Sequence, residues 1–266
     1  MIKNGSPGWY SFMSNPFKLS GTYLVTGGTR GIGRAISLQL ARSGAHVIAN
    51  YQRDENAAGE LKALAEKENL PIYLCRADVC SAKKRELIEA ELARSRQPLK
   101  GFIHCAATGT HRPIGELTGR HLEWTFALNV RAFLELANFL THKFVSGSSI
   151  VALSSGGAVR AFPNYAVVGA SKGALESLAR HMAAELGPRG IRVNVIAPGP
   201  IATDAWKAIP ESQARFNEAA NRSPLRRLVT PEEVATVAQF LCSAASIGIN
   251  GQTLTVDGGA GMAAWG

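Results

Sequence analysis

Short apolar runs alternate along the chain with longer stretches in which apolar residues recur at helical spacing. This alternation is typical of βαβ units, which build a parallel sheet covered by helices. The predicted strands are residues 22–25, 46–50, 72–75, 101–105, 150–153, 193–196 and 253–256. The predicted helices are residues 32–43, 55–68, 82–95, 122–144, 166–185 and 231–244. The pattern therefore predicts an α/β fold, a Rossmann-type doubly wound sheet of seven mainly parallel strands in a single domain.

Two segments fall outside this alternation. Residues 1–18 carry scattered Gly, Pro, Ser and Asn and predict an N-terminal arm, which leaves residues 19–266 for the domain. Residues 203–227 form a long insertion before the last predicted helix. Because long insertions in compact domains are usually lids or binding loops, we expect this segment to cover a substrate.

Composition narrows the class of protein. A chain of 266 residues that is 46% hydrophobic can bury one sizeable core. It has no apolar run of membrane-spanning length and no secretory signal, so we expect a soluble, cytoplasmic protein with no membrane partner. Its four cysteines lack metal-binding spacing, so we expect no metal site. The net charge of +9 comes from scattered basic residues, which argues against nucleic acid. A solvated surface explains this charge, and an acidic partner or a phosphate-bearing substrate is the alternative.

A glycine-rich turn follows the first predicted strand. Its sequence is Thr26-Gly27-Gly28-Thr29-Arg30-Gly31-Ile32-Gly33, and a helix begins directly after it. Separated glycines permit a tight turn, close backbone approach to a pyrophosphate, and close contact between strand and helix. The amides and dipole of a helix N-terminus favour phosphate groups. The turn therefore predicts a dinucleotide-binding site.

The GxxxGxG spacing of this turn resembles that of the short-chain dehydrogenase/reductase family, and the resemblance covers nearly the whole chain. It is carried further by Asp78-Val79, Cys105-Ala106-Ala107, Asn129, Ser154-Ser155, Pro198-Gly199-Pro200 and Asp257-Gly258-Gly259. It implies hydride transfer with a nicotinamide dinucleotide. The cofactor residues it implies are Gly27, Thr29, Arg30, Gly31, Ile32 and Gly33 in the turn, Asp78 and Val79 at the adenine, Ala106 at the ribose, and Pro198, Gly199, Ile201 and Thr203 toward the nicotinamide. For Ile201, simple core packing is the alternative.

The end of the second strand bears on the choice of dinucleotide. A carboxylate there would accept hydrogen bonds from the adenosine ribose and repel a 2′-phosphate. Tyr51 stands at this position, and Arg30 and Arg53 offer two cations to a phosphate. We therefore predict NADPH rather than NADH. Asp54 lies close enough in sequence to weaken that preference, and a solvated Arg53 is the alternative.

The catalytic residues depart from the usual family pattern. Members of the family carry a Tyr four residues before a Lys on one helix, with a Ser at the preceding strand end and an Asn one helix earlier. Lys172, Ser155 and Asn129 match that pattern, but Val168 stands four residues before the lysine, and Tyr165 precedes it by seven. Seven residues are about two helical turns, so the two side chains can share a face.

This Tyr-x6-Lys spacing resembles the divergent enoyl-acyl-carrier-protein reductases of the family. The best-known of these place a second Tyr where Ser155 stands, so the chain is more similar to their NADPH-using, ketoreductase-like branch. The resemblance implies hydride transfer to Cβ of a trans-2-enoyl thioester. Tyr165 would then stabilise the thioester oxygen, and Lys172 would hold the nicotinamide ribose and lower the proton affinity of the phenol. Ser155 would support the substrate oxygen or cap local backbone, and Asn129 would hold a water relay or a helix kink.

Two alternatives remain open. A 3-oxoacyl or other carbonyl reductase could use Tyr165 through a distorted helix start, in which Asn164 after Pro163 caps the helix. A non-catalytic dinucleotide-binding scaffold would explain why position 168 lacks a tyrosine. The presence of Lys172 and of a replacement tyrosine argues against the scaffold.

The expected partners follow from charge and from the resemblance. Acyl carrier proteins are acidic, so a basic surface near the lid favours a carrier-bound acyl thioester of fatty-acid or related biosynthesis. The candidate contacts are Arg215, Arg222, Arg226 and Arg227. Family members are commonly tetramers, which implies a homotetramer whose interface is formed by the long helices that start near Leu122 and Ala166.

Overall fold

One parallel sheet organises the computed structural model, which describes residues 15–201 and 212–261. Its strands are β1 (Thr22–Thr26), β2 (His46–Tyr51), β3 (Ile72–Arg76), β4 (Leu99–His104), β5 (Phe144–Leu153), β6 (Arg192–Pro198) and β7 (Thr253–Val256). They lie in the order β3-β2-β1-β4-β5-β6-β7, and every neighbouring pair is parallel. The predicted single-domain, doubly wound Rossmann-type fold is confirmed.

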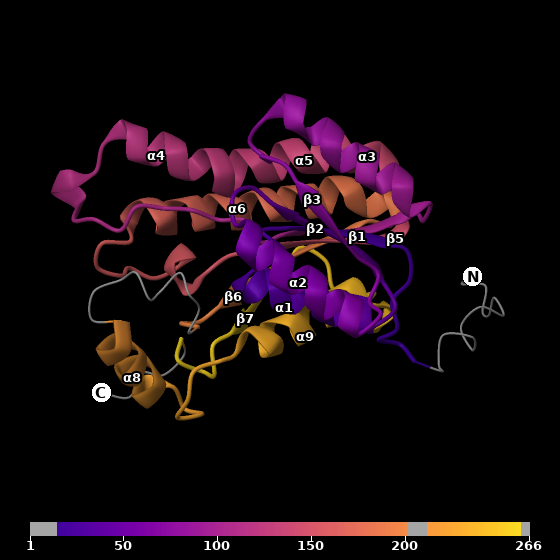
Figure 1. Ribbon diagram of the computed structural model, residues 1–266. Coiled ribbons are helices and arrows are strands. Elements are labelled where there is room, and N and C mark those ends of the chain that lie inside the picture. The colour runs from indigo at the N-terminus through magenta and orange to yellow at the C-terminus, as the bar shows by residue number, and fades with distance from the viewer. Residues whose placement is uncertain (1–14, 202–211, 262–266) are drawn as a thin grey trace, which may run out of the picture.

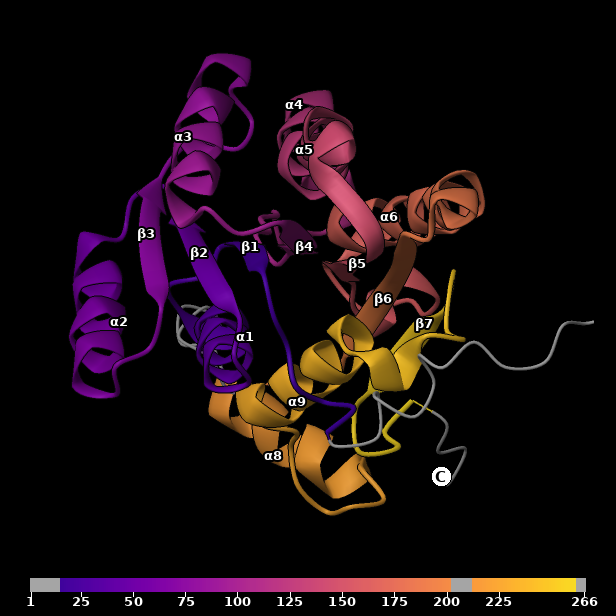
Figure 2. The same cartoon turned by 90° about the vertical axis from the view of Figure 1, so that its right-hand side faces the viewer.

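Helices cover both faces of the sheet (Figures 1 and 2). On one face lie α1 (Gly31–Arg42), α2 (Glu55–Lys67) and α9 (Pro231–Cys242); on the other lie α3 (Arg85–Ser95), α4 (Gly119–Phe126), α5 (Ala132–Leu140) and α6 (Ala166–Leu186). A further helix, α8 (Ser212–Arg222), lies apart from these layers at the lower left of Figure 1. This arrangement buries the central strands on both faces, which is why their sequences read as continuous apolar runs.

Each face of the sheet has its own apolar core. Ile36 of α1 and Leu241 of α9 are fully buried against β1, β4 and β5 on one side. Phe133 of α5 and Leu175 of α6 are fully buried on the other side, where they join Phe102 of β4. Burial of one such side chain contributes about 1.5–3 kcal/mol, so the strands that carry the site residues are firmly held.

The helix predicted over residues 122–144 was wrong in its extent. α4 ends at Phe126, a π-helical turn follows at Ala127–Arg131, and α5 ends at Leu140. Phe144 already belongs to β5, which starts six residues before the predicted strand. Ser148 and Ser149 lie in the part of β5 outside the predicted strand, and both are buried. Their hydroxyls donate to the carbonyls of Leu99 and Leu241, which satisfies them there.

Only the end of the predicted N-terminal arm can be described. Phe17 packs against Phe240 of α9, and its carbonyl accepts a hydrogen bond from the side chain of Gln239. Within residues 15–201 and 212–261, no helix combines the length and the apolar character needed to cross a bilayer.

Candidate active site

The glycine turn connects β1 to α1 where the strand order reverses between β1 and β4. Gly27 and Gly31 have φ values of 63° and 52°, which favour glycine. A Cβ atom on Gly33 would lie 2.0 Å from the carbonyl oxygen of Gly27. A Cβ on Gly27 would lie 3.0 Å from Cα of Ala106, in the loop after β4. The turn therefore runs close to both α1 and the β4 loop, and a crevice at such a switch point is the usual dinucleotide site.

The N-terminus of α1 is suited to a diphosphate. Its N-cap residue, Arg30, makes no side-chain capping hydrogen bond, and no acidic residue lies in the first turn. By contrast, α9 begins with a capping box in which Thr230 and Glu233 satisfy the first amides. The amides and dipole of α1 are thus available to an anion, so these residues fit the pyrophosphate of a dinucleotide.

A buried histidine, which sequence reasoning missed, positions the β4 loop. The Ala106 amide donates to Oγ1 of Thr26 at 3.2 Å, and that hydroxyl lies 3.1 Å from Nδ1 of His104. Nε2 of His104 lies 3.1 Å from the Leu128 carbonyl, so Nε2 carries the proton and Nδ1 accepts from Thr26. Burial lowers the pKa of His104 to about 3, and the charge of Lys172 acts in the same direction. His104 therefore stays neutral and fixes the backbone at Ala106.

At the adenosine end, acidic side chains accompany the predicted cations. The Tyr51 hydroxyl donates to Oε2 of Glu55 at 2.9 Å, and Arg76 pairs with Oε1 of the same carboxylate at 2.6 Å. Arg30 lies 3.7 Å from Asp54, which also caps α2. Glu55, four residues after Tyr51, is therefore a second acid at this end besides Asp54, and it was not considered from the sequence.

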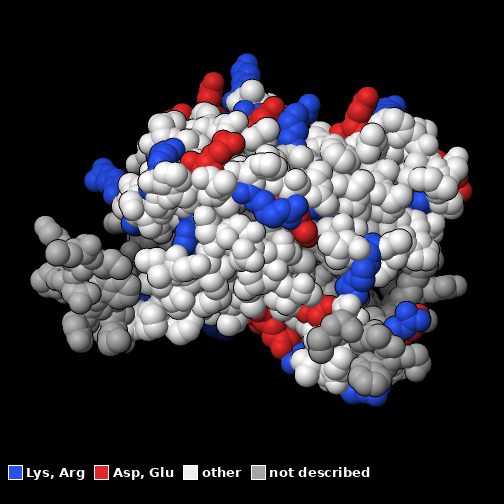
Figure 3. Space-filling model, turned by 180° about the vertical axis from the view of Figure 1, so that it is seen from behind, with Lys and Arg blue, Asp and Glu red and all other residues white. Residues whose placement is uncertain are grey.

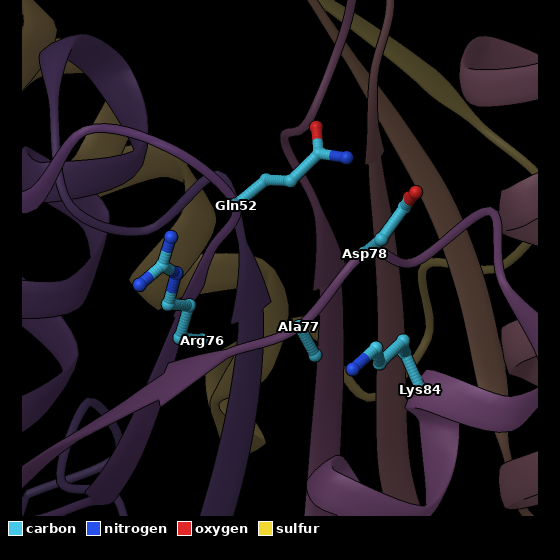
Figure 4. Close-up of a pocket in the computed structure, with 5 residues that line it drawn as sticks. All are labelled: Gln52, Arg76, Ala77, Asp78 and Lys84. Carbon is cyan, nitrogen blue, oxygen red and sulfur yellow. The ribbon is translucent and has the colours of Figure 1, made fainter.

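A cavity of about 420 Å³ lies beside these residues (Figure 4) and is lined by Gln52, Arg76, Ala77, Asp78 and Lys84. Asp78, predicted at the adenine, lines it directly and accepts a hydrogen bond from the Cys80 amide. Val79 is buried beneath, and Arg53 is exposed. The lining of this cavity therefore includes two cationic side chains and one carboxylate.

The segment predicted to hold the nicotinamide follows β6. Its Gly199 amide donates to the Val256 carbonyl at 2.9 Å, so Pro198 and Gly199 are held against β7. Ile201 is 3% exposed and belongs to an apolar core cluster, in agreement with the core-packing alternative. Thr203 lies outside the described residues.

Tyr165 stands at the N-cap of α6, and not within its first turn. Its carbonyl accepts from the Gly169 amide at 2.7 Å, whereas Asn164 adopts a left-handed φ of 62° and does not cap the helix. The phenol oxygen lies 3.1 Å from Oγ of Ser155. The ring fits over Gly157, where a Cβ would lie 2.4 Å from Cε1. Only glycine at position 157 leaves room for the ring of Tyr165 in this orientation.

The surroundings of Tyr165 explain its acidity and its access. Burial raises the pKa of the phenol, and the hydrogen bond with Ser155 opposes that rise. The expected lowering of the phenol pKa by Lys172 is not what the structure shows. His111 and Phe162 contact the ring edge to face at 5.3 and 6.0 Å, and a cavity of about 380 Å³ borders it. Tyr165 is therefore a protonated phenol that borders this cavity and can donate a hydrogen bond.

Lys172 lies two turns into α6 and is 5% exposed. Its Nζ donates to the Leu153 carbonyl at 2.7 Å, so it and Tyr165 are both anchored at the end of β5. Burial lowers the pKa of Lys172 to about 8, while Cys105 and Glu176 oppose the shift. Glu176, one turn further on, is itself buried and accepts from Oγ of Ser154 at 2.6 Å.

The usual tyrosine position holds an apolar side chain that faces the β4 loop. Val168 is 6% exposed, and its Cγ2 would lie 2.2 Å from a Cβ on Gly109. No hydroxyl is therefore available one turn before Lys172. The phenol reaches the end of β5 from Tyr165 instead.

The contacts of Ser155 and Asn129 bear on the two alternative roles that the sequence left open for each residue. Ser155 caps local backbone, which is one of its two expected roles, because Oγ accepts from the Gly157 amide at 3.0 Å. Its Oγ also lies 3.1 Å from the phenol oxygen of Tyr165, and support of a substrate oxygen stays a prediction. Asn129 is fully buried in the π-helical turn. Its amide pairs with both backbone groups of Thr108 at 2.9 Å and donates to Ser171 at 2.8 Å. These contacts agree with the helix-kink alternative.

The basic residues near the predicted lid are largely engaged with neighbours. Arg222 pairs with Glu218, Arg227 pairs with Glu233, and Arg226 donates to a backbone carbonyl. The side chain of Arg215 lies outside the described residues. On the face seen in Figure 3, basic and acidic side chains are interspersed and form no basic stripe.

Comparisons with known proteins decide the family. A family model described as enoyl-(acyl carrier protein) reductase matches residues 27–261. A 1-cyclohexenylcarbonyl-CoA reductase from Streptomyces collinus is 36% identical, over 91% of this chain and 87% of that protein. The chain belongs to the short-chain dehydrogenase/reductase family. It is also similar to the enoyl-[acyl-carrier-protein] reductase [NADH] FabI of Escherichia coli K12, with 34% identity over 91% of this chain and 94% of that protein.

Solved structures of short-chain dehydrogenases/reductases agree with the fold. Gluconate 5-dehydrogenase from Burkholderia cenocepacia J2315, in complex with NADP and tartrate, matches with a TM-score of 0.85 and 28% identity. The match covers 93% of this chain and 98% of that one. Membership in this family makes the chain an oxidoreductase with a dinucleotide-binding fold.

Proposed function

We propose that the chain reduces the trans-2 double bond of an enoyl thioester with NADPH. The observation that carries this proposal is the pairing of Tyr165 with Ser155, 3.1 Å apart, while the buried Val168 occupies the usual tyrosine position. A conjugate reduction places negative charge on a carbonyl oxygen that is three bonds from Cβ, the carbon receiving hydride. A proton donor displaced toward the start of α6 suits that geometry.

NADPH, when bound, would supply a hydride to Cβ, and a proton added at Cα would complete the saturated product. The residues of the chain would orient the substrate and stabilise the charge of the intermediate enolate. Tyr165 donates a hydrogen bond to the thioester oxygen, and Ser155 supports it. Lys172 holds the nicotinamide ribose hydroxyls, and Asn129 keeps Ser171 and the β4 loop in place. The raised pKa of Tyr165 keeps the donor protonated at neutral pH.

The proposed cofactor contacts keep the residues of the sequence prediction. The turn residues Gly27 to Gly33 cradle the diphosphate, Asp78 and Val79 border the adenine, and Ala106 flanks the ribose. Relatives support both dinucleotides, since one solved neighbour holds NADP and FabI is named for NADH. Residues 203–227 are proposed as the lid, an acidic acyl carrier protein as the substrate carrier, and a homotetramer as the assembly.

A carbonyl reductase remains the second candidate, and one observation favours it. The hydroxyls of Ser155 and Tyr165 are close enough to bind a single oxygen, as the reduction of a ketone requires. In addition, an L-xylulose reductase from Caenorhabditis elegans is 34% identical over 89% of this chain and 94% of that protein.

Steady-state oxidation of NADPH with matched C4 thioesters separates the two candidates. We expect turnover with crotonyl thioester, accompanied by formation of the butyryl product in mass spectrometry, and little turnover with acetoacetyl thioester. Consumption of NADPH with the keto substrate alone would overturn the proposal and establish the carbonyl reductase.

A further inference from the structure

Arg76 is placed to select the dinucleotide. In the register of the sheet, Arg76 at the end of β3 lies opposite Tyr51 at the end of β2. Neighbouring strands are about 4.8 Å apart, so Arg76 is one strand away from the position where a carboxylate would favour NADH. Glu55, the first residue of α2, accepts from Tyr51 and pairs with Arg76. These three side chains form one charged group at the tip of two strands.

The cavity beside this group carries a second cation. Arg76 and Lys84 both line it, and Figure 4 shows Lys84 extending toward Ala77 from the start of the next helix. Asp78 is the acidic member of the lining. The cavity therefore presents two cationic side chains, Arg76 and Lys84, to a ligand bound beside the carboxyl end of β2.

The ion pair that holds Arg76 is open to exchange. The side chains of Arg76 and Glu55 are 64% and 54% exposed, and exposed pairs of this kind are weak because water screens both charges. A phosphate dianion offers more charge and more acceptor oxygens than a carboxylate, and a guanidinium binds it through two parallel hydrogen bonds. A 2′-phosphate at this place would therefore compete with Glu55 for Arg76.

We propose that Arg76 is a ligand of the 2′-phosphate of NADPH and that Glu55 is the counter-charge which this phosphate displaces. The inference rests on the NADPH preference of the proposed function and adds a selecting residue to Arg30 and Arg53. Glu55 opposes the preference, since its carboxylate both repels the phosphate and competes for the cation. The two partners of one ion pair thus act in opposite directions on the same ligand.

Calorimetric titration with two probes tests this without any turnover. The probes are 2′,5′-ADP, which carries the 2′-phosphate, and 5′-AMP, which lacks it. For Arg76→Met we expect the affinity for 2′,5′-ADP to fall by about tenfold or more, since a charged hydrogen-bond donor is lost, with 5′-AMP binding little changed. For Glu55→Gln, which still accepts from Tyr51, we expect 2′,5′-ADP to bind more tightly.

A matched control is provided by Arg42 and Glu68, another exposed pair, which joins the other ends of α1 and α2. Arg42→Met and Glu68→Gln should leave the affinity for both probes unchanged. If Arg76→Met and Glu55→Gln weaken both probes alike, the pair is structural and the inference is overturned.

The remaining outcomes separate this inference from the proposed function. If the wild-type protein prefers 2′,5′-ADP and Arg76→Met keeps that preference, the role of Arg76 is overturned and the NADPH proposal stands. If the wild-type protein binds both probes equally, the NADPH preference itself is overturned, together with the selecting role. Loss of the preference in Arg76→Met supports the inference whichever thioester the enzyme reduces.

Discussion

Charged side chains are exposed at one end of the proposed cofactor crevice, the adenosine end, and buried at the other, the catalytic end. At the adenosine end, Arg30 and Arg76 are 66% and 64% exposed in their side chains, and each faces a carboxylate. At the catalytic end, Lys172 is 5% exposed and is held by a backbone carbonyl. Exposed charges are screened and exchange partners readily, whereas a buried charge keeps one geometry. The first arrangement suits selection among ligands, and the second suits chemistry at a fixed point.

The largest effect should come from the donor at the catalytic end. Tyr165→Phe removes the hydroxyl that contacts Ser155 but keeps the ring over Gly157, so the fold should be preserved. We expect kcat on crotonyl thioester to fall by about 10²–10³-fold, the usual cost of losing one preorganised donor. Phe162→Leu, which changes a ring neighbour without a hydroxyl, serves as the control. Unchanged turnover in Tyr165→Phe would remove Tyr165 from the chemistry.

The glycine turn between the two ends should tolerate no side chain. In Gly33→Ala the new Cβ would meet the Gly27 carbonyl at 2.0 Å, so the turn must shift. We expect a loss of about 2–4 kcal/mol in the free energy of unfolding, together with weakened 5′-AMP binding. Gly59→Ala in α2 is the matched control, because nothing lies within 4 Å of its Cβ. That variant should gain about 0.5–1 kcal/mol in urea denaturation.

The buried lysine should give the catalytic end a pH limit. Lys172 has a pKa of about 8, below its ordinary 10.5, so it loses its proton as the pH rises through 8. We expect kcat/KM to fall above that pH by up to about tenfold per unit, while the raised pKa of Tyr165 keeps the phenol protonated. Between pH 8 and 10.5 the unfolded chain binds a proton that the folded chain does not. The contribution of Lys172 to stability therefore rises with pH in that window.

Glu176→Gln sharpens this test. The charge of Glu176 raises the pKa of Lys172, and its carboxylate accepts from Ser154 as a glutamine oxygen also would. The groups that face Lys172 are Cys105 and His104 from the β4 side and Glu176 from α6. We expect the high-pH limit to move to lower pH in the variant. A limit that stays in place would show that Glu176 does not act on Lys172 through its charge.

The smallest effect should come from salt, and only at the adenosine end. The Debye length shortens from about 10 Å at 0.1 M to about 3 Å at 1 M, which weakens interactions between exposed charges. We expect the affinity for 2′,5′-ADP to fall by a few fold over that range in calorimetry. The kcat on a small enoyl thioester at saturating cofactor should change little. An equal loss of 2′,5′-ADP affinity and of kcat would contradict the contrast between exposed charges at one end and a buried charge at the other.

The fold was largely predictable because its signals are local. Buried parallel strands have continuous apolar sequences. The start of α9 is marked by a capping box of Thr230 and Glu233 and by Pro231 at its first position. A kink at Asn129 was one of two alternatives from the sequence, but the π-helical form of the turn was not predicted, because the side chain of Asn129 bonds to Thr108, which is distant in sequence. The early start of β5 was missed for the same reason, since Ser148 and Ser149 find their partners on other elements.

The site was predictable where family motifs mark it and not where contacts between elements decide. The glycine turn was a candidate from its spacing, and Lys172 and Tyr165 were candidates from the resemblance to the family pattern. Glu55 was missed because its relation to Tyr51 and Arg76 arises only when β2, β3 and α2 come together. His104 gave one usable signal, a polar residue that ends an apolar strand, but its role needs Thr26 and Leu128 in place.

The contact between Val168 and Gly109 couples two positions that are distant in sequence. A Cβ atom at position 109 would lie 2.2 Å from Cγ2 of Val168, so a side chain at position 109 requires a smaller or differently placed side chain at position 168. The residue at the usual tyrosine position and the path of the β4 loop therefore cannot be redesigned separately.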